Sequence, residues 1–151
     1  MINVNLFFIH MRLNKVYKFL PLLLLLISPL LASDVINQRQ DSMQDFNKLM
    51  RAANQSLKNG EIEGLAEIYG DIESIMKTYP TLFPDDSFDG KTKASNDIID
   101  NREAFNQIAN DTSEWAALAK IAAENNDLEA LQQHQQNLYG SCKSCHSRFK
   151  N

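Results

Sequence analysis

The two cysteines of this 151-residue chain stand three positions apart, in the unit Cys142-Lys143-Ser144-Cys145-His146. Two thiols one helical turn apart can each add to a vinyl group on the same porphyrin edge, and the imidazole beside the second thiol can then ligate the iron. The spacing therefore predicts one covalently attached haem c, held by Cys142 and Cys145, with His146 as an axial ligand of the iron.

Three other uses of this motif have less support. A redox C-x-x-C is expected at a strand-to-helix turn, and no strand pattern occurs nearby. A structural zinc ion needs about four ligands, and only His134 is close enough in sequence to join the three of the motif. A disulfide between cysteines three apart on one helix would be strained.

The residues before the motif predict that it lies on the inner face of a helix. Counting back from Phe149 in steps of four and three, the positions are Cys145, Cys142, Leu138, Gln135, Leu131 and Leu128, and all but Gln135 are apolar. The haem would therefore lie inside a helical bundle. His146 is about 100° round the helix from this face, which suits a side chain reaching a ring centre.

Residues 1–33 have the pattern of an export signal. Three cations precede an apolar run from Phe19 to Leu31, and the small residues Ala32 and Ser33 follow as a cleavage site. The run is shorter than the ~20 residues of a membrane span, so we expect a cleaved signal and no stable membrane anchor. The mature domain would be residues 34–151 in the periplasm, and Met1 and Met11 both fit as the start.

The charge of the mature domain limits its partners. Without the three leader cations the chain has 12 Lys and Arg against 19 Asp and Glu, a net charge of −7. Such a surface is a poor partner for nucleic acid or for an anionic membrane. It suits a periplasmic redox partner protein with a basic surface.

The mature domain is patterned as four helices. Apolar residues recur at helical spacing over residues 36–57, 62–79, 98–122 and 128–149, interrupted by Gly60, by Pro80 and by Asn125-Asn126. We expect a long loop over 81–95, a third helix that begins near Ser95 or Asn96, and a last helix capped by Asp127.

Two short connections and one long one predict an all-α, antiparallel up-down-up-down four-helix bundle with a covalently attached haem. Tyr69 and Tyr79 are expected to keep their hydroxyls at the edge of the bundle while their rings pack inward. In this topology Met43 and His146 fall toward the same end, so Met43 can face His146 across the haem.

Two residues of the first helix have more than one interpretation. A methionine on an apolar face is core filler by default, as we expect for Met50 and Met76. Arg39 is a cation on that otherwise apolar face, one turn before Met43. It either extends to solvent from the open end of the helix or pairs with a haem propionate, and we favour the propionate because an unpaired desolvated cation is costly.

These features resemble the cytochrome c′ family, the class II c-type cytochromes, over nearly all of residues 34–151. The resemblance rests on Arg39-Gln40 followed by Met43, on Thr81-Leu82-Phe83-Pro84, and on the C-x-x-C-H unit near the end. It implies that Arg39 and Gln40 contact the propionates. Five-coordinate members of the family have an apolar residue, commonly Leu, at the position of Met43, and a low-spin branch has a ligating Met there. Met43 therefore indicates the low-spin branch, with His146 and Met43 as the iron ligands.

The resulting hypothesis is a monohaem electron carrier of the periplasm. The alternative is a five-coordinate haem protein that binds nitric oxide or carbon monoxide, with Met43 only packing on the ring. A structural adaptor with an adventitious motif is a third class. No nucleophile–base or paired-carboxylate arrangement indicates an enzyme, so no catalytic residue is assigned, and His134 is interpreted as a surface residue. The sequence leaves the redox partners, the potential and homodimer formation open, although related bundles often pair through the first two helices.

Overall fold

The computed structural model describes residues 28–151. Most of the predicted export signal lies outside the described residues. Its last six positions, 28–33, are the start of helix α3 (Ser28–Asn59), and the boundary between leader and mature domain stays a prediction. Among the described residues, none of the helices is both long enough and apolar enough to cross a membrane.

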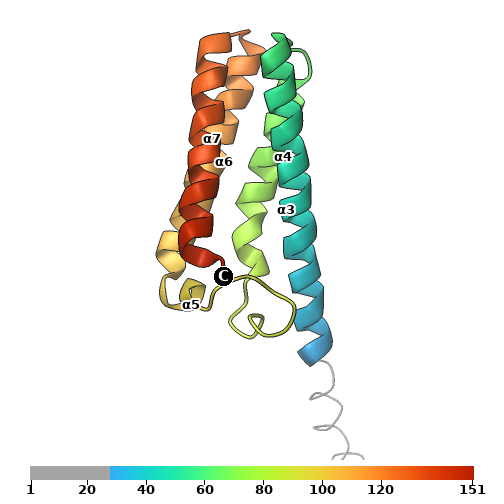
Figure 1. The fold of residues 1–151 in the computed structure, drawn as a ribbon, viewed down its shortest axis with the longest axis vertical. Coiled ribbons are helices and arrows are strands. Elements are labelled where there is room, and N and C mark those ends of the chain that lie inside the picture. The colour runs from blue at the N-terminus through green and yellow to red at the C-terminus, as the bar shows by residue number, and fades with distance from the viewer. Residues whose placement is uncertain (1–27) are drawn as a thin grey trace, which may run out of the picture. The chain divides into compact units, whose positions relative to one another are not determined.

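The compact unit Val35–Asn151 is an up-down-up-down bundle, as predicted (Figure 1). After α3 the elements are α4 (Leu65–Thr78), the 3-10 helix η1 (Tyr79–Leu82), α5 (Asp97–Asp100), α6 (Arg102–Glu124) and α7 (Leu128–Phe149). The connections 60–64 and 125–127 lie at one end, which we call the closed end. The long connection between η1 and α6 and the end of α7 lie at the other, the site end.

The second helix differs from its prediction at both ends. It begins at Leu65 rather than at Ile62, because Gly64 before it has a left-handed backbone, with φ of 80°, that cannot continue a helix backwards. Ile62 still packs against the core from the preceding turn. Pro80 was predicted to end the second helix, and α4 does end just before it, at Thr78. Pro80 itself lies in η1, a tighter 3-10 helix that follows α4 directly and leads into the loop.

The third helix was predicted as one element and is two. Asn101 has φ of −123° and interrupts the helix between α5 and α6. Both its backbone N–H and its side-chain Nδ2 donate to the carbonyl of Asp97, each at 3.0 Å. An asparagine side chain that bonds a nearby backbone group competes with regular helix geometry in this way. The cap of the last helix is confirmed, since an Asp127 carboxylate oxygen accepts from the Ala130 N–H at 3.0 Å.

A continuous core toward the closed end is packed largely from small and medium-sized side chains. Fully buried residues from several helices meet there, with exposed fractions of zero for Ala53, Leu65, Tyr69, Ile72, Ala116, Ala119, Leu131 and Leu138. Alanines on α6 let neighbouring helices approach closely, and the larger side chains of Phe46, Met50 and Tyr69 fill the remaining space.

One polar contact crosses this core. The Tyr69 hydroxyl donates to Gln135 Oε1 at 2.9 Å, and Gln135 Nε2 donates to the Met50 carbonyl at 3.4 Å. The prediction of a Tyr69 hydroxyl at the bundle's edge is therefore wrong: the side chain is fully buried, and burial raises the pKa of its hydroxyl. Gln135, the polar exception on the α7 face, links three helices. We call this group the Tyr69–Gln135 clasp.

The site end has a second, aromatic core. Phe83, Ile98, Phe105 and Phe149 form it. The Phe105 ring packs edge-on against Phe83, at a centroid distance of 4.8 Å, and against Phe149, at 5.4 Å. These rings fasten the long loop and the end of α7 to α6.

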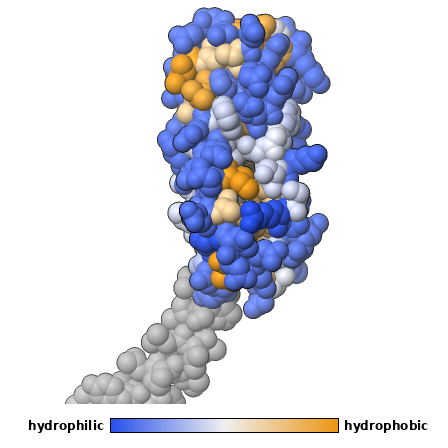
Figure 2. All heavy atoms as spheres, turned by 90° about the vertical axis from the view of Figure 1, so that its left-hand side faces the viewer, coloured by the Kyte–Doolittle hydropathy of each residue, from blue (hydrophilic) through white to orange (hydrophobic). Residues whose placement is uncertain are grey.

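The face formed by α6 and α7 is mainly hydrophilic, with separate apolar areas (Figure 2). The exposed large apolar residues of these two helices are Leu118 and Ile121 on α6 and Leu128 and Tyr139 on α7. Leu128 was predicted on the inner face of the last helix, but as the first residue of α7 it is 38% exposed.

Candidate haem-binding site

A cavity of about 640 Å³ at the site end brings together the residues that the sequence singled out. All six predicted site residues line it: Arg39, Gln40 and Met43 from α3, and Cys142, Cys145 and His146 from α7. α3 and α7 are the first and last helices of a bundle that alternates in direction, so they lie antiparallel. The start of α3 and the end of α7, about one hundred residues apart in sequence, therefore both line the cavity.

The two cysteines are free and half-buried on the cavity side of α7. Burial, with a smaller contribution from the neighbouring Cys142, raises the pKa of the Cys145 thiol to about 11. Burial also raises the pKa of Cys142. Both groups are therefore protonated thiols at neutral pH, spaced along one face as the haem-attachment motif requires.

His146 lies at the rim of the cavity. The residue as a whole is exposed, but its ring is partly desolvated, and this desolvation together with the positive charge of Lys150 lowers the pKa of the imidazole. A lowered pKa favours the neutral form, which is the form that ligates a metal.

Met43 lines the same cavity and is partly buried. It also packs against the core cluster that contains Phe46, Met50 and Met76. The placement of Met43 and His146 around one cavity agrees with the prediction that they fall at the same end of the bundle.

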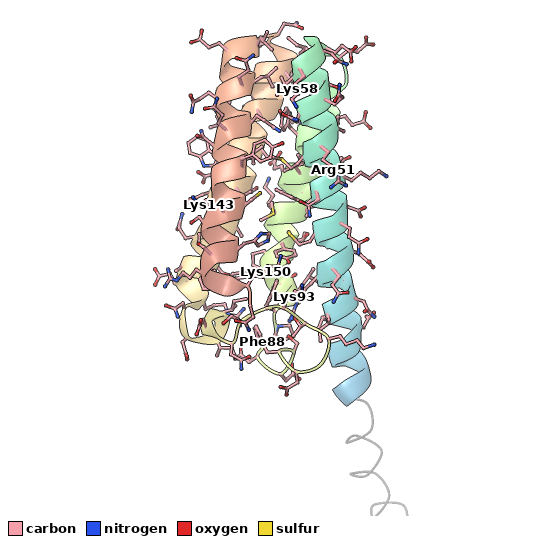
Figure 3. The ribbon with its side chains drawn as sticks, viewed as in Figure 1. Arg51, Lys58, Phe88, Lys93, Lys143 and Lys150 are labelled. Carbon is pink, nitrogen blue, oxygen red and sulfur yellow. The ribbon has the colours of Figure 1, made fainter. Side chains whose placement is uncertain are left out.

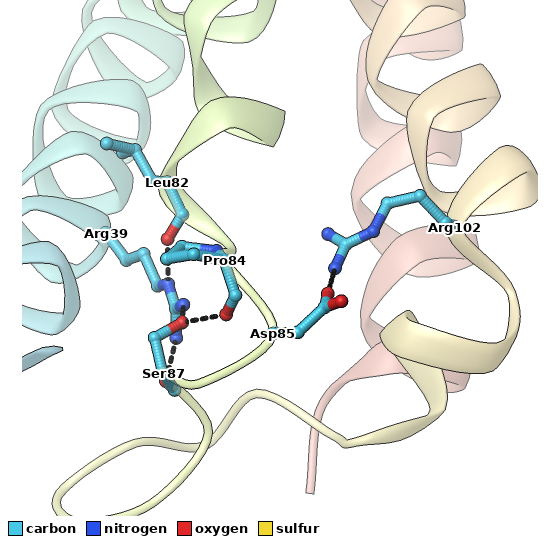
Figure 4. A network of polar contacts seen from close by, with 6 residues as sticks. All are labelled: Arg39, Leu82, Pro84, Asp85, Ser87 and Arg102. Atoms are coloured by element: carbon cyan, nitrogen blue, oxygen red, sulfur yellow. Dashed lines mark hydrogen bonds and ion pairs between the residues drawn. The ribbon is translucent and has the colours of Figure 1, made fainter.

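Arg39 is buried, with 4% of its surface exposed, so it does not extend to solvent. Figure 4 shows its polar contacts with the loop after η1. Its Nε donates to the Leu82 carbonyl at 2.6 Å, and its Nη1 donates to the Ser87 carbonyl at 2.9 Å. Nη2 donates to the Ser87 hydroxyl, which itself donates to the Pro84 carbonyl. Arg39 thus ties the loop after η1 to α3.

Two aromatic faces complete the surroundings of Arg39. The guanidinium carbon lies 4.1 Å from the centroid of the Phe83 ring and 5.2 Å from that of Phe88. Cation–π contacts of this kind offset part of the cost of desolvating the cation. That desolvation is also the main cause that lowers the Arg39 pKa. The predicted contact of Arg39 with a propionate stays a prediction.

Gln40 joins α3 to the far part of the same loop. Its side-chain Nε2 donates to the Lys91 carbonyl at 2.9 Å, although the residue is exposed. We call residues 91–95 the strap, and its first four residues, Lys91, Thr92, Lys93 and Ala94, line the cavity. No role for the strap was predicted from its residues, and its two lysines in a segment without helical period were the only signal.

His134 is not the ordinary surface residue that we expected. Its ring stacks on Trp115, with centroids 5.9 Å apart, and its Nδ1 is buried without a hydrogen-bond partner in the described structure. His134 is not among the residues lining the cavity.

The residues present fit a haem. The cavity volume lies within the ~300–1,000 Å³ of sites for large organic ligands, and much of its wall is apolar, including Phe46, Met76, Phe83 and Phe105. Two free thiols and an adjacent imidazole on one helix are the donor set for covalent attachment with one axial ligand. Fold and site together define a c-type haem protein built on an antiparallel four-helix bundle.

Comparison with known proteins assigns the family. Residues 34–150 match the sequence profile of the family described as Cytochrome C'. The chain belongs to the cytochrome c′ family, and it carries one covalently attached haem c with iron.

A relative and two solved structures illustrate the likeness. The cytochrome c′ of Rhodospirillum rubrum is 42% identical over 81 residues, which are 52% of this chain and 54% of the relative, so the chain spans about half the length of this curated relative. Cytochrome c prime from Shewanella frigidimarina superposes with a TM-score of 0.74 at 22% identity, over 80% of this chain and 96% of that one. A nitric oxide complex of a variant of the Alcaligenes xylosoxidans protein superposes with a TM-score of 0.68 at 18% identity, over 80% and 96%. At these identities the two structures show the shared fold.

Proposed function

We propose that this chain is a periplasmic haem protein that binds a small gas such as nitric oxide or carbon monoxide. In this proposal Cys142 and Cys145 anchor the haem, His146 is the protein ligand on one side, and Met43 lies on the other side without ligating. When bound, the haem supplies an iron that changes oxidation state by one electron and takes up diatomic ligands.

The observation that carries the proposal is the convergence of these residues on one cavity. Met43 packs against the same core cluster as Met50 and Met76, which serve as filler. Its packing is accounted for without a bond to iron, which favours an open sixth position. The family and the nitric oxide complex of the Alcaligenes xylosoxidans variant also support gas binding over electron transfer.

The second candidate function is the electron carrier with both His146 and Met43 as ligands. One observation favours it: the Met43 side chain lines the same cavity as His146. A thioether at the sixth position would favour the reduced state and exclude other ligands. In both cases the site has the haem as its reactive group, and the protein supplies ligands, burial and nearby charge.

An absorption spectrum of the purified protein separates the two functions. The gas-binding proposal expects high-spin haem that takes up carbon monoxide readily, with little change in the Met43→Leu variant. A low-spin spectrum that becomes high-spin in Met43→Leu, but not in the matched control Met50→Leu, would establish the electron carrier instead. The replacement conserves volume closely enough that both variants should fold.

Covalent attachment has its own test. Haem should remain with the denatured chain after extraction with acidified organic solvent. Cys142→Ala and Cys145→Ala should each reduce the retained haem, while Ser144→Ala, which leaves the C-x-x-C-H spacing intact, should not. Loss of all haem from the unmodified chain on extraction would contradict the assignment of these thiols.

A further inference from the structure

A second cavity lies next to the haem cavity, between α6 and α7. Its volume is about 300 Å³, and it is lined by Ile108, Asp111 and Trp115 of α6 and by residues of α7 between Gln136 and Ser144. We call it the α6–α7 cavity. It is large enough for a diatomic gas, since a cavity of only about 10–15 Å³ can hold a water molecule.

Two residues line both cavities and therefore form the partition between them, Ile108 of α6 and Ser141 of α7. The Ser141 hydroxyl donates to the Asn137 carbonyl at 3.2 Å, so this small side chain is turned back along its own helix. Ile108 is partly buried and packs against the aromatic core of the site end. A change of the Ile108 rotamer is the smallest movement that would connect the two cavities, and side chains in packed interiors do change rotamer.

The α6–α7 cavity is not closed by its own residues. A Cβ atom at Gly140 would contact nothing within 4 Å beyond its own helix. The Trp115 ring is held in a stack with His134, and the Asp111 carboxylate accepts from Gln107 of the same helix at 2.7 Å. Across the part of the chain that the structure describes, no side-chain hydrogen bond joins α6 to α7 over this cavity.

The haem cavity is fastened on the side that the strap lines. Lys93 of the strap and Lys150 after α7 both line the cavity and lie close together at the site end (Figure 3). The Asn151 N–H donates to the Lys93 carbonyl at 2.9 Å, and Ala94 and Lys150 form an antiparallel bridge. Widening the cavity here would break backbone contacts, whereas at the partition only a side chain has to move.

The charge of the α6–α7 cavity favours a neutral ligand. Asp111 is the one charged residue among the described residues that line it. An anion would be repelled by this carboxylate, whereas nitric oxide and carbon monoxide have no net charge.

We propose that a diatomic gas reaches the haem cavity through the α6–α7 cavity, with Ile108 as the gate. The inference rests on the proposed gas-binding function and names the route to the same site. A gate changes the barrier for entry and for exit alike, so it alters both rates by one factor and leaves the affinity unchanged. A residue that contacts the bound gas alters the affinity instead.

The test is the kinetics of carbon monoxide binding to the haem-loaded ferrous protein, measured by flash photolysis and by ligand replacement. Ile108→Ala opens the partition and should raise both the association and the dissociation rate about tenfold. Gly140→Leu places a side chain in the α6–α7 cavity and should lower both rates about threefold. Leucine favours a helix more than glycine does, so this variant should fold. The dissociation constant should stay the same in both.

Two matched controls separate the route from a general effect of the substitutions. Ile75→Ala shortens a partly buried isoleucine that packs against the other core, and Gln132→Leu adds an apolar side chain to the exposed surface of α7. Neither residue lines either cavity, so both variants should keep the rates of the unmodified protein. Ile108→Ala and Gly140→Leu rates that match these controls would overturn the route. A rate change matched by a change in the dissociation constant would also overturn it.

The outcomes keep this inference separate from the proposed function. A low-spin protein with Met43 on the iron would overturn the gas-binding function. The route would then be tested with the same variants in the Met43→Leu background, where the sixth position is open. A crystal structure of the haem-loaded protein gives a second readout: the α6–α7 cavity should remain open, with the Ile108 side chain between it and the haem. Closure of α6 against α7 over this cavity would contradict the proposal.

Discussion

The two ends of the bundle are packed in opposite ways. Toward the closed end, apolar side chains from several helices bury one another completely, and short connections join the helices. At the site end, residues of α3 and α7 line a cavity of about 640 Å³, and a long loop is held by aromatic rings and one buried cation. Protein interiors rarely contain large voids. The closed end meets this rule with its own side chains, whereas the site end needs a ligand to fill its cavity.

The largest loss of stability should come from shortening a buried side chain in the core toward the closed end. Leu131→Ala removes a fully buried side chain and leaves a void between helices that are already closely packed, so the free energy of unfolding should fall by about 4 kcal/mol. Urea unfolding of the haem-loaded protein measures it. Leu128→Ala, one turn earlier and 38% exposed, is the control and should cost about 1 kcal/mol or less. Equal losses would contradict the closed core as the main source of stability.

Arg39→Leu should have the next largest effect, and at the other end. Two carbonyls and a hydroxyl lose their donor, two aromatic faces lose a cation, and leucine cannot replace either contact. The expected loss is about 3 kcal/mol. Arg51→Leu on the exposed side of the same helix should change stability by about 0.5 kcal/mol or less. If Arg39→Leu left the free energy of unfolding unchanged, the aromatic rings and the strap would hold the loop without Arg39.

The Tyr69–Gln135 clasp offers a sharper test of the closed core. Gln135→Leu leaves the Tyr69 hydroxyl buried without its acceptor, so unfolding should become easier by about 2 kcal/mol. Adding Tyr69→Phe removes the orphaned hydroxyl and should restore part of the loss, giving a measurable coupling in a double-mutant cycle. Purely additive losses would show that the hydrogen bond does not link the two residues.

The smallest effect expected is at the cap of α7. Asp127→Ala removes the acceptor for the Ala130 N–H and should cost about 1 kcal/mol. Asp71→Ala, an exposed aspartate within α4, is the control and should change little. If hydrogen exchange of the first turn of α7 did not accelerate in Asp127→Ala, the cap would not be what holds the start of this helix.

The sequence predicted most of what depends on local pattern. Helical periodicity identifies the four helices and their order, and the C-x-x-C-H spacing identifies the haem-attachment motif before any coordinates are known. Placing Met43 and His146 at one end needed only the lengths of the helices and the alternating topology. Asp127 was recognisable as a cap because its role involves a residue three positions away.

What the sequence did not predict depends on distant partners. Arg39 bonds Ser87 across 48 positions, and Tyr69 bonds Gln135 across 66. A cation or an amide on an apolar face shows that a partner is needed, but the pattern does not say which one. For Arg39 the two alternatives considered, solvent and propionate, did not include the backbone of a loop whose course was unknown. The break at Asn101 was missed because the apolar spacing continues through it.

The Tyr69–Gln135 clasp also fixes the position of the haem-attachment motif along the axis of α7. Gln135 lies seven residues before Cys142 on the same helix face, a rise of about 10 Å. Sliding α7 by one turn, about 5.4 Å, would part Gln135 from the Tyr69 hydroxyl and the Met50 carbonyl. The same slide would carry Cys142, Cys145 and His146 out of level with the α3 wall. A polar contact far from the cavity thus fixes the height at which the attachment motif meets it.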